Sequence, residues 1–131
     1  MLYIFEVHIC EGHTAEEYAE AWQEASRLIQ QAPGALGTRL HRKIGDDRTL
    51  IAVARWSSKA ERDAMEARHD ERVEAIIRGI APCCQTRVLG EFEEAEWVVE
   101  PSLPTTHADW GHLDHKPGSS AGGEHWLGPS V

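Results

Sequence analysis

The sequence lacks the features that mark a nucleic-acid-binding, membrane-spanning or disulfide-stabilised protein. Acidic residues outnumber basic ones, with 22 Asp and Glu against 13 Lys and Arg, which gives a formal net charge of −9. A surface that binds phosphate groups needs an excess of Lys and Arg. No apolar run approaches the roughly 20 residues of a membrane span, and the first residues enter an alternating pattern instead of a signal peptide. We therefore expect no nucleic-acid partner, no membrane partner and a cytoplasmic location.

Cysteine is also scarce. Cys10 and the adjacent pair Cys83-Cys84 form neither a disulfide framework nor a Cys-x-x-Cys pair, which fits a reducing compartment. We interpret them as small strand residues without chemistry. What is present is an ordinary globular composition, 41% hydrophobic and 27% charged, in 131 residues, which is enough for one domain with a real core.

Apolar and polar residues alternate in a way that predicts four strands, interrupted by two helices. The strands are expected over residues 2–10, 36–44, 49–56 and 83–92. Gly45 to Arg48 supplies the turn of a hairpin. The order strand, helix, strand, strand, helix, strand is that of the α+β, ferredoxin-like βαββαβ fold with an antiparallel sheet, which we assign to residues 1–95.

Two capping boxes mark where the helices begin. Thr14–Glu17 and Ser58–Glu61 have the spacing in which a hydroxyl caps the third helical amide and a Glu reaches back to the cap. The first helix is expected to end at Pro33-Gly34. The second is expected to run unbroken to Pro82, with His69 on its apolar face.

From Pro101 the composition changes to Pro, Gly, Ser, Thr and His, which is typical of an extended arm. We assign residues 96–131 to this arm and hypothesise that it docks on the domain or on a partner subunit. The apolar residues that would hold it are Trp110, Leu113, Trp126 and Leu127. The arm also carries ligand types for a divalent metal, namely His107, Asp109, His112, His115 and His125. Their spacing matches no known metal motif, so we assign no metal site.

A four-stranded sheet with two helices on one side leaves its other face bare. The alternation assigns to that face Glu6, His8, Arg39, His41, Arg55 or Trp56, Gln85 and Arg87, interleaved with Ala52 and Ala54. Such a face is too apolar for water and too polar for a dry core. We expect two copies to pack sheet to sheet as a homodimeric α+β barrel that encloses the polar part in a ligand cavity. The alternative is a monomer with a solvated sheet face.

The segment Ile51–Ser58, a strand that ends in Trp56 and leads into a capped helix carrying His69, resembles the antibiotic biosynthesis monooxygenase family over residues 2–92. The resemblance implies a dimeric α+β barrel and, in the enzymatic members, an oxygenase that acts on an aromatic or polyketide substrate without metal or flavin. It also implies a site role for Trp56, and it puts His69 near the haem-ligand position of the haem-degrading branch. We expect no cofactor.

Cofactor-free oxygenation needs a base, donors that hold the resulting oxyanion and a dry cavity around both. The catalytic candidates are His8, His41, Trp56 and Arg39, and the substrate-binding candidates are Glu6, Arg55, Arg87 and His69. The two strand histidines would act as base and donor, while an arginine holds the anion.

A structural role without catalysis stays open for several of these candidates. The polar residues around Glu6 fit an interface network between subunits, His69 fits a packing role, and Trp56 fits a core anchor. The enzyme hypothesis is a cofactor-independent monooxygenase or isomerase acting on a small aromatic metabolite. The competing hypothesis is a non-catalytic dimeric protein that binds a small hydrophobic ligand or haem.

Overall fold

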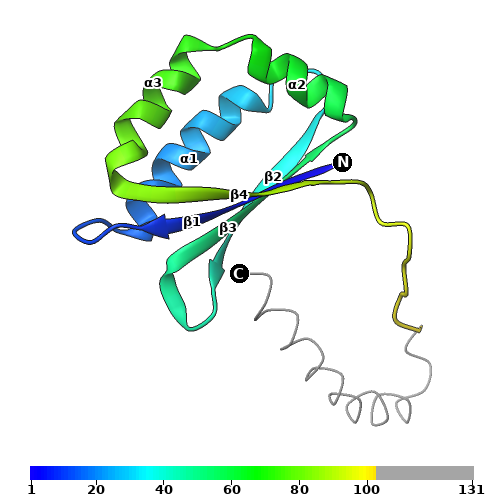
Figure 1. Cartoon of the computed structure of the whole chain (residues 1–131), viewed down its shortest axis with the longest axis horizontal. Helices are drawn as coiled ribbons and strands as arrows, with labels where there is room; N and C mark the ends of the chain where they lie inside the picture. Colours follow the sequence, from blue (N-terminus) through cyan, green and yellow to red (C-terminus); the bar gives the residue numbers. More distant parts are fainter. Residues whose placement is uncertain (103–131) are drawn as a thin grey trace. The chain divides into compact units, whose positions relative to one another are not determined.

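The computed structural model describes residues 1–102, of which Met1–Glu96 form one compact unit. A four-stranded antiparallel sheet in the order β2-β3-β1-β4 carries the helices on one side, with α1 and α3 side by side (Figure 1). The elements are β1 Leu2–Ile9, α1 Ala15–Ile29, β2 Ala35–Lys43, β3 Asp46–Trp56, α2 Lys59–Ala67, α3 Glu71–Ile80, the 3-10 helix η1 Ala81–Cys83 and β4 Cys84–Phe92. The predicted ferredoxin-like α+β fold is confirmed, and β3 begins earlier than expected.

The predictions for the C-terminal arm fall on residues that the structure does not describe. They concern docking through Trp110, Leu113, Trp126 and Leu127, and metal binding through His107, Asp109, His112, His115 and His125, all of which lie outside the described residues. None of the helices found in residues 1–102 is both long and apolar enough to cross a membrane.

Local hydrogen bonds start the first two helices where the sequence predicts. The Glu17 amide donates to Thr14 Oγ1 at 3.1 Å, and the Thr14 amide donates to the Glu17 carboxylate at 3.4 Å. This reciprocal pair is the capping box of α1. Ser58 caps α2 by accepting from the Glu61 amide at 3.2 Å, but the predicted capping box is only half formed, because the Glu61 carboxylate accepts from the Ser57 and Ser58 hydroxyls instead of the Ser58 amide. These bonds satisfy amides that have no partner within the helix.

The prediction of one continuous second helix is wrong, because the chain breaks between α2 and α3. His69 takes a φ of 48°, in the left-handed region that ends a helix. Asp70 then caps α3 by accepting from the Arg72 amide at 2.9 Å. A hydrogen bond from the Arg72 guanidinium lowers the pKa of Asp70 to about 2, so the cap is charged at neutral pH. The side chain of His69 is 76% exposed, so it is not the packing residue of a helix face.

The hydrophobic core lies between the sheet and the helices. Its buried cluster consists of Val7, Ile9, Ala15, Tyr18, Leu50 and Cys83. Burial raises the pKa of the Cys83 thiol, and it raises the pKa of Cys84 to about 11. Thiols with raised pKa values are poor nucleophiles, which agrees with the absence of a Cys-x-x-Cys motif.

Strand pairing determines which side chains share a face of the sheet. Residues directly opposite one another on neighbouring strands point to the same side. Val7 opposite Leu50 therefore marks the helix-covered face, and Glu6 opposite Ile51 marks the other. Ala52, Ala54 and Trp56 follow Leu50 at a period of two and lie on the helix-covered face, where Trp56 is 2% exposed. The prediction that placed the two alanines on the bare face is wrong, and Arg55 takes the position that the sequence left open between Arg55 and Trp56.

Candidate functional site

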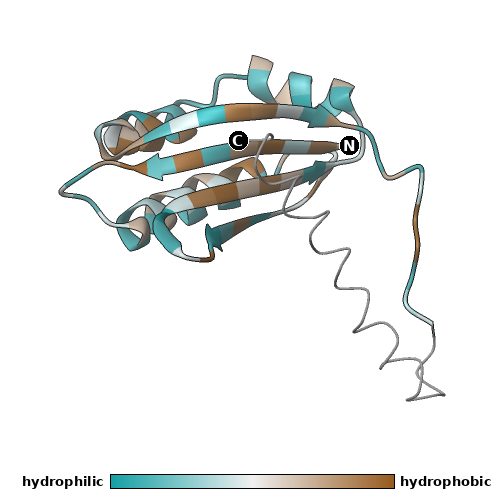
Figure 2. Cartoon of the chain, turned by 60° about the horizontal axis from the view of Figure 1, so that its bottom comes forward, coloured by the Kyte–Doolittle hydropathy of each residue, from teal (hydrophilic) through white to brown (hydrophobic). Residues whose placement is uncertain are grey.

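Hydrophilic and hydrophobic residues are interleaved along the strands (Figure 2), and the strand pairing places both kinds on the open face, meaning the side of the sheet opposite the helices. Its polar members are Glu6, His8, Arg39, His41, Thr49, Arg55, Gln85 and Arg87. Its apolar members are Leu2, Ile4, Ile51, Val53 and Phe92. All four strands contribute, because the alternation of each strand presents every second residue to this side.

Glu6 is the centre of the polar network on the open face. It sits on the central strand β1, opposite Arg87 of β4, and is only 9% exposed. One carboxylate oxygen, Oε1, accepts from His8 Nε2 at 2.9 Å and from the Arg87 guanidinium at 3.2 Å. A carboxylate that is this buried needs such partners. His8 and Arg87 supply these partners, and their hydrogen bonds to Glu6 fix the orientation of both side chains.

The second ring nitrogen of His8 is also engaged. His8 Nδ1 lies 3.3 Å from Thr49 Oγ1, and the Thr49 hydroxyl donates to Asp46 Oδ2 at 2.6 Å. A threonine hydroxyl has one proton to give, so Thr49 accepts from His8 when it donates to Asp46. Both ring nitrogens of His8 thus lie within hydrogen-bond distance of a side chain of the open face. These contacts orient the ring of His8 and leave it less accessible to a ligand than an imidazole without such contacts.

Asp46 anchors the far end of this network. The Thr49 hydroxyl, and then the backbone amide of Arg48 at 3.1 Å, hold the pKa of Asp46 below its ordinary value. A chain of side chains therefore runs along the open face from Asp46 through Thr49 and His8 to Glu6. Charged groups at both ends strengthen such hydrogen bonds.

His41 and Arg39 differ from His8 in being unengaged. Both lie on β2, opposite Ile51 and Val53 of β3, and both are exposed. Within residues 1–102 neither side chain makes a hydrogen bond or an ion pair. A free imidazole beside a free guanidinium, bordered by apolar side chains, can take a proton and hold the resulting anion.

Arg55 lies on the open face but is paired at its edge. Its guanidinium donates to the Glu94 carboxylate and lowers the pKa of that carboxyl. Glu94 Oε1 is also 3.7 Å from the N-terminal ammonium of Met1. Arg55 is thus less available to a ligand than Arg39.

The structure does not bring Trp56 or His69 to the open face. Trp56 is buried on the opposite side of the sheet, where its role is packing. His69 lies in the break between α2 and α3, with Nδ1 3.2 Å from the Glu74 carboxylate. The other six predicted site residues share the open face, and three of them form the network around Glu6.

Sequence reasoning missed Thr49 and Asp46. Thr49 lies directly opposite His8, and its place on the open face follows from the same alternation that identified Arg55. Asp46 was assigned to the hairpin turn. Its contacts are local, with the Arg48 amide two residues along the chain and the Thr49 hydroxyl three residues along, and an Asp in a turn that binds nearby backbone amides is the signal that could have found it.

The sequence profile described as Antibiotic biosynthesis monooxygenase matches residues 1–71, more than half of the 131-residue chain. This match confirms the resemblance found in the sequence. No curated protein matches the chain.

Solved structures share the fold. SnoaB, a cofactor-independent oxygenase from Streptomyces nogalater, superposes with a TM-score of 0.65 at 11% identity, covering 76% of this chain and 96% of its own. A conserved protein of unknown function from Bacteroides thetaiotaomicron gives 0.57 at 13% identity, covering 66% and 89%. A Nitrosomonas europaea protein assigned to the antibiotic biosynthesis monooxygenases gives 0.54 at 10% identity, covering 71% and 100%. At these identities the likeness shows the fold alone.

Proposed function

Because the chain belongs to the antibiotic biosynthesis monooxygenase family, we propose that it is a monooxygenase acting without metal or flavin on a small aromatic, polyketide-like metabolite. One observation carries the proposal: the open face sets the imidazole of His41 and the guanidinium of Arg39, neither of which has a side-chain partner in the described part of the chain, near an ordered polar network and among apolar side chains. SnoaB, which shares the fold, is a cofactor-independent oxygenase.

The proposed active unit is a homodimer closed over the open face. Exposed apolar side chains such as Phe92, at 47% exposure, favour burial against a second copy by about 25 cal/mol per Å². The charged residues of the same face disfavour a dry interface. Packing two sheets face to face meets both needs, since the apolar residues are covered and the polar residues line an enclosed cavity.

His41 is the proposed base. The ring nitrogens of His8 contact Glu6 and Thr49, whereas the imidazole of His41 makes no hydrogen bond within residues 1–102. A substrate of the anthrone type has a methylene group, next to aromatic rings, whose proton an imidazole can remove. The resulting carbanion is stabilised as an oxyanion, for which the Arg39 guanidinium supplies positive charge.

The reaction balances without an external reductant. The carbanion reduces molecular oxygen, a carbon–oxygen bond forms and the dioxygen bond breaks. The methylene group becomes a carbonyl group, one atom of dioxygen enters the product and the other leaves as water. The four electrons needed come from the substrate, so the protein has to supply only a base, an oxyanion site and exclusion of water.

The test measures oxygen uptake with dithranol, a dihydroxyanthrone, against its spontaneous oxidation in the same buffer. The wild-type dimer is expected to accelerate uptake, and His41→Ala to slow the catalysed rate about 100-fold or more, as removal of a general base does. His69→Ala, which removes an exposed histidine away from the open face, is the matched control and is expected to keep the wild-type rate.

Sedimentation of the same variants separates a catalytic role from an interface role. A His41→Ala protein that is folded and dimeric but inactive supports the proposal. One that becomes monomeric or unfolds identifies His41 as an interface residue and contradicts it. Saturable binding of the quinone product without any oxygen uptake would favour the non-catalytic binding protein.

A further inference from the structure

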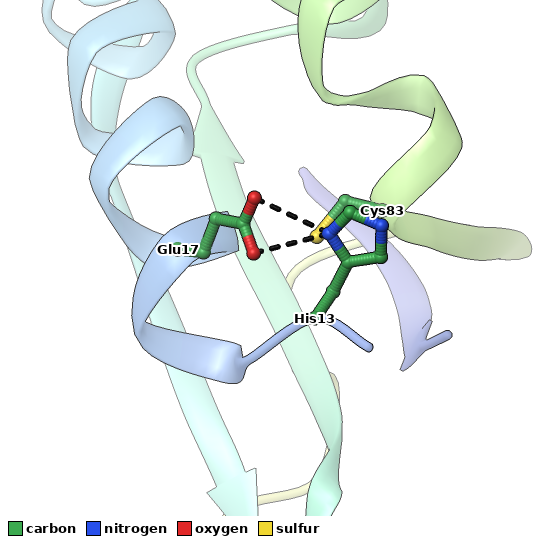
Figure 3. A group of neighbouring side chains, drawn as sticks. All are labelled: His13, Glu17 and Cys83. Carbon is green, nitrogen blue, oxygen red and sulfur yellow. Dashed lines mark hydrogen bonds and ion pairs between the residues drawn. The ribbon is translucent and has the colours of Figure 1, made fainter. Parts of the chain in front are cut away.

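Three different metal-ligating side chains converge where β1 leads into α1, away from the open-face network. A ring nitrogen of His13, a carboxylate oxygen of Glu17 and the Sγ of Cys83 all lie within 4.8 Å of one another, and Figure 3 shows the three side chains pointing toward one another. They come from the loop after β1, the first turn of α1 and the 3-10 helix η1. Segments far apart in the sequence thus place one nitrogen, one oxygen and one sulfur at the same point.

The backbone holds these three residues in place. The Cys10 amide donates to the Cys83 carbonyl at 2.8 Å, and the His13 amide donates to the Cys10 carbonyl at 3.2 Å. The loop that carries His13 is therefore tied directly to the turn that carries Cys83. Glu17 is fixed in turn by its capping box with Thr14. Ligands that are ordered before binding cost less free energy to assemble.

The spacing is close to that of a tetrahedral site. Zinc binds thiolate sulfur at about 2.3 Å and imidazole nitrogen or carboxylate oxygen at about 2.0–2.2 Å, so neighbouring ligand atoms lie roughly 3.3–3.7 Å apart. His13 Nδ1 is already 3.1 and 3.2 Å from the two oxygens of Glu17. Cys83 Sγ lies within 4.8 Å of the other two ligand atoms, so it has to close by at most about 1.1–1.5 Å to reach this spacing.

Burial and ligand chemistry agree on the kind of ion. Cys83 is 2% exposed, while the side chains of His13 and Glu17 are 33% and 49% exposed, which leaves the outer side of the cluster open to water as a fourth ligand. A thiolate with an imidazole selects a borderline-soft ion over calcium or magnesium, which take oxygen ligands. The metal deprotonates a coordinating thiol.

We propose that His13, Glu17 and Cys83 bind one divalent transition-metal ion of the zinc class. The site is structural: it would clamp the loop after β1 and the first turn of α1 to η1. It is independent of the proposed oxygenase chemistry on the open face.

The experiment titrates the chelator-treated full-length protein with cobalt(II), followed by zinc competition. Stoichiometric binding with a thiolate-to-cobalt charge-transfer absorption that zinc abolishes is the expected result. His13→Ala and Glu17→Gln should each weaken binding about tenfold or more, and Cys83→Ser should remove the charge-transfer band.

Matched controls test whether another thiol or another histidine binds the metal, and whether a variant has lost its fold. Cys84→Ser and His69→Ala should bind like the wild type, and circular dichroism should show that every variant is folded. Because Cys83 is buried, the two partly exposed ligands keep the test decisive if Cys83→Ser fails to fold. Cobalt binding that lacks the thiolate band would overturn the proposal, as would binding that survives His13→Ala but is lost with His112→Ala in the arm.

Discussion

Two substitutions of His69, to alanine and to glycine, test whether the chain breaks between α2 and α3. Which of the two variants has the larger free energy of unfolding differs between a broken and a continuous helix. Its φ of 48° lies in the left-handed region, which costs a residue with a Cβ about 1–2 kcal/mol and costs glycine almost nothing. Its exposed ring contacts the Glu74 carboxylate, a surface pair that contributes little. His69→Ala and His69→Gly both lose this contact, so the difference between them reports the backbone alone.

We expect His69→Gly to be the more stable variant by about 0.5–1 kcal/mol, because relief of the strain exceeds the extra entropy of glycine in the unfolded chain, about 0.5–1 kcal/mol. In the interior of a continuous helix the order would reverse, with alanine better by about 1 kcal/mol. Urea unfolding, with the midpoint and slope measured for both variants, resolves a difference in free energy of unfolding between these two cases. A more stable His69→Ala protein would refute the break, and with it the removal of His69 from the candidate site.

Four further substitutions test the faces of the sheet. Trp56→Ala should lower the free energy of unfolding by about 3–5 kcal/mol, since the ring is 2% exposed, whereas Arg55→Ala should hardly shift the urea midpoint. Phe92→Glu should convert the proposed dimer to a monomer in sedimentation, and a dimeric variant would locate the interface elsewhere. Thr49→Val should remove the hydrogen bond that lowers the pKa of Asp46. A lowered pKa stabilises the fold above the ordinary value of 3.8 and ceases to do so as the pH falls below it. The melting temperatures of wild type and Thr49→Val should therefore converge between about pH 5 and pH 2, and a constant gap would contradict the assignment.

The element order was predictable because local signals and the global fold agree. Strand alternation, the capping box at Thr14–Glu17 and the cap at Ser58 each act over a few residues, and the structure contains all of them. The break at His69 was missed because Met65, His69 and Val73 continue the four-residue spacing of a helix across it. Asp70 is a helix N-cap residue type in the middle of that run, and it was the signal that favours a new start.

The candidate site was predictable as a face but not as a network. Alternation alone places Glu6 and His8 on one side of their own strand, and the pairing of β1 with β4, in which Glu6 lies opposite Arg87, brings Arg87 to the same side. Whether Arg55 or Trp56 joins them depends on the pairing of β1 with β3, in which Leu2 lies opposite Arg55. The pairing of two strands that are far apart in the sequence cannot be deduced from the alternation within each strand, so both Arg55 and Trp56 stayed open as members of the face. The engagement of both ring nitrogens of His8 likewise depends on cross-strand distances.

The central claim is that the open face is a cofactor-free oxygenase site with His41 as its base. Mass spectrometry of the product formed from dithranol under oxygen-18 gas, with chelator-treated protein, tests it most directly. The wild-type dimer should form quinone carrying one oxygen-18 atom faster than the spontaneous reaction, and the His41→Ala dimer should form it at the spontaneous rate. Labelled product that the wild type forms no faster than buffer, or that the His41→Ala dimer forms as fast as the wild type, would contradict the claim.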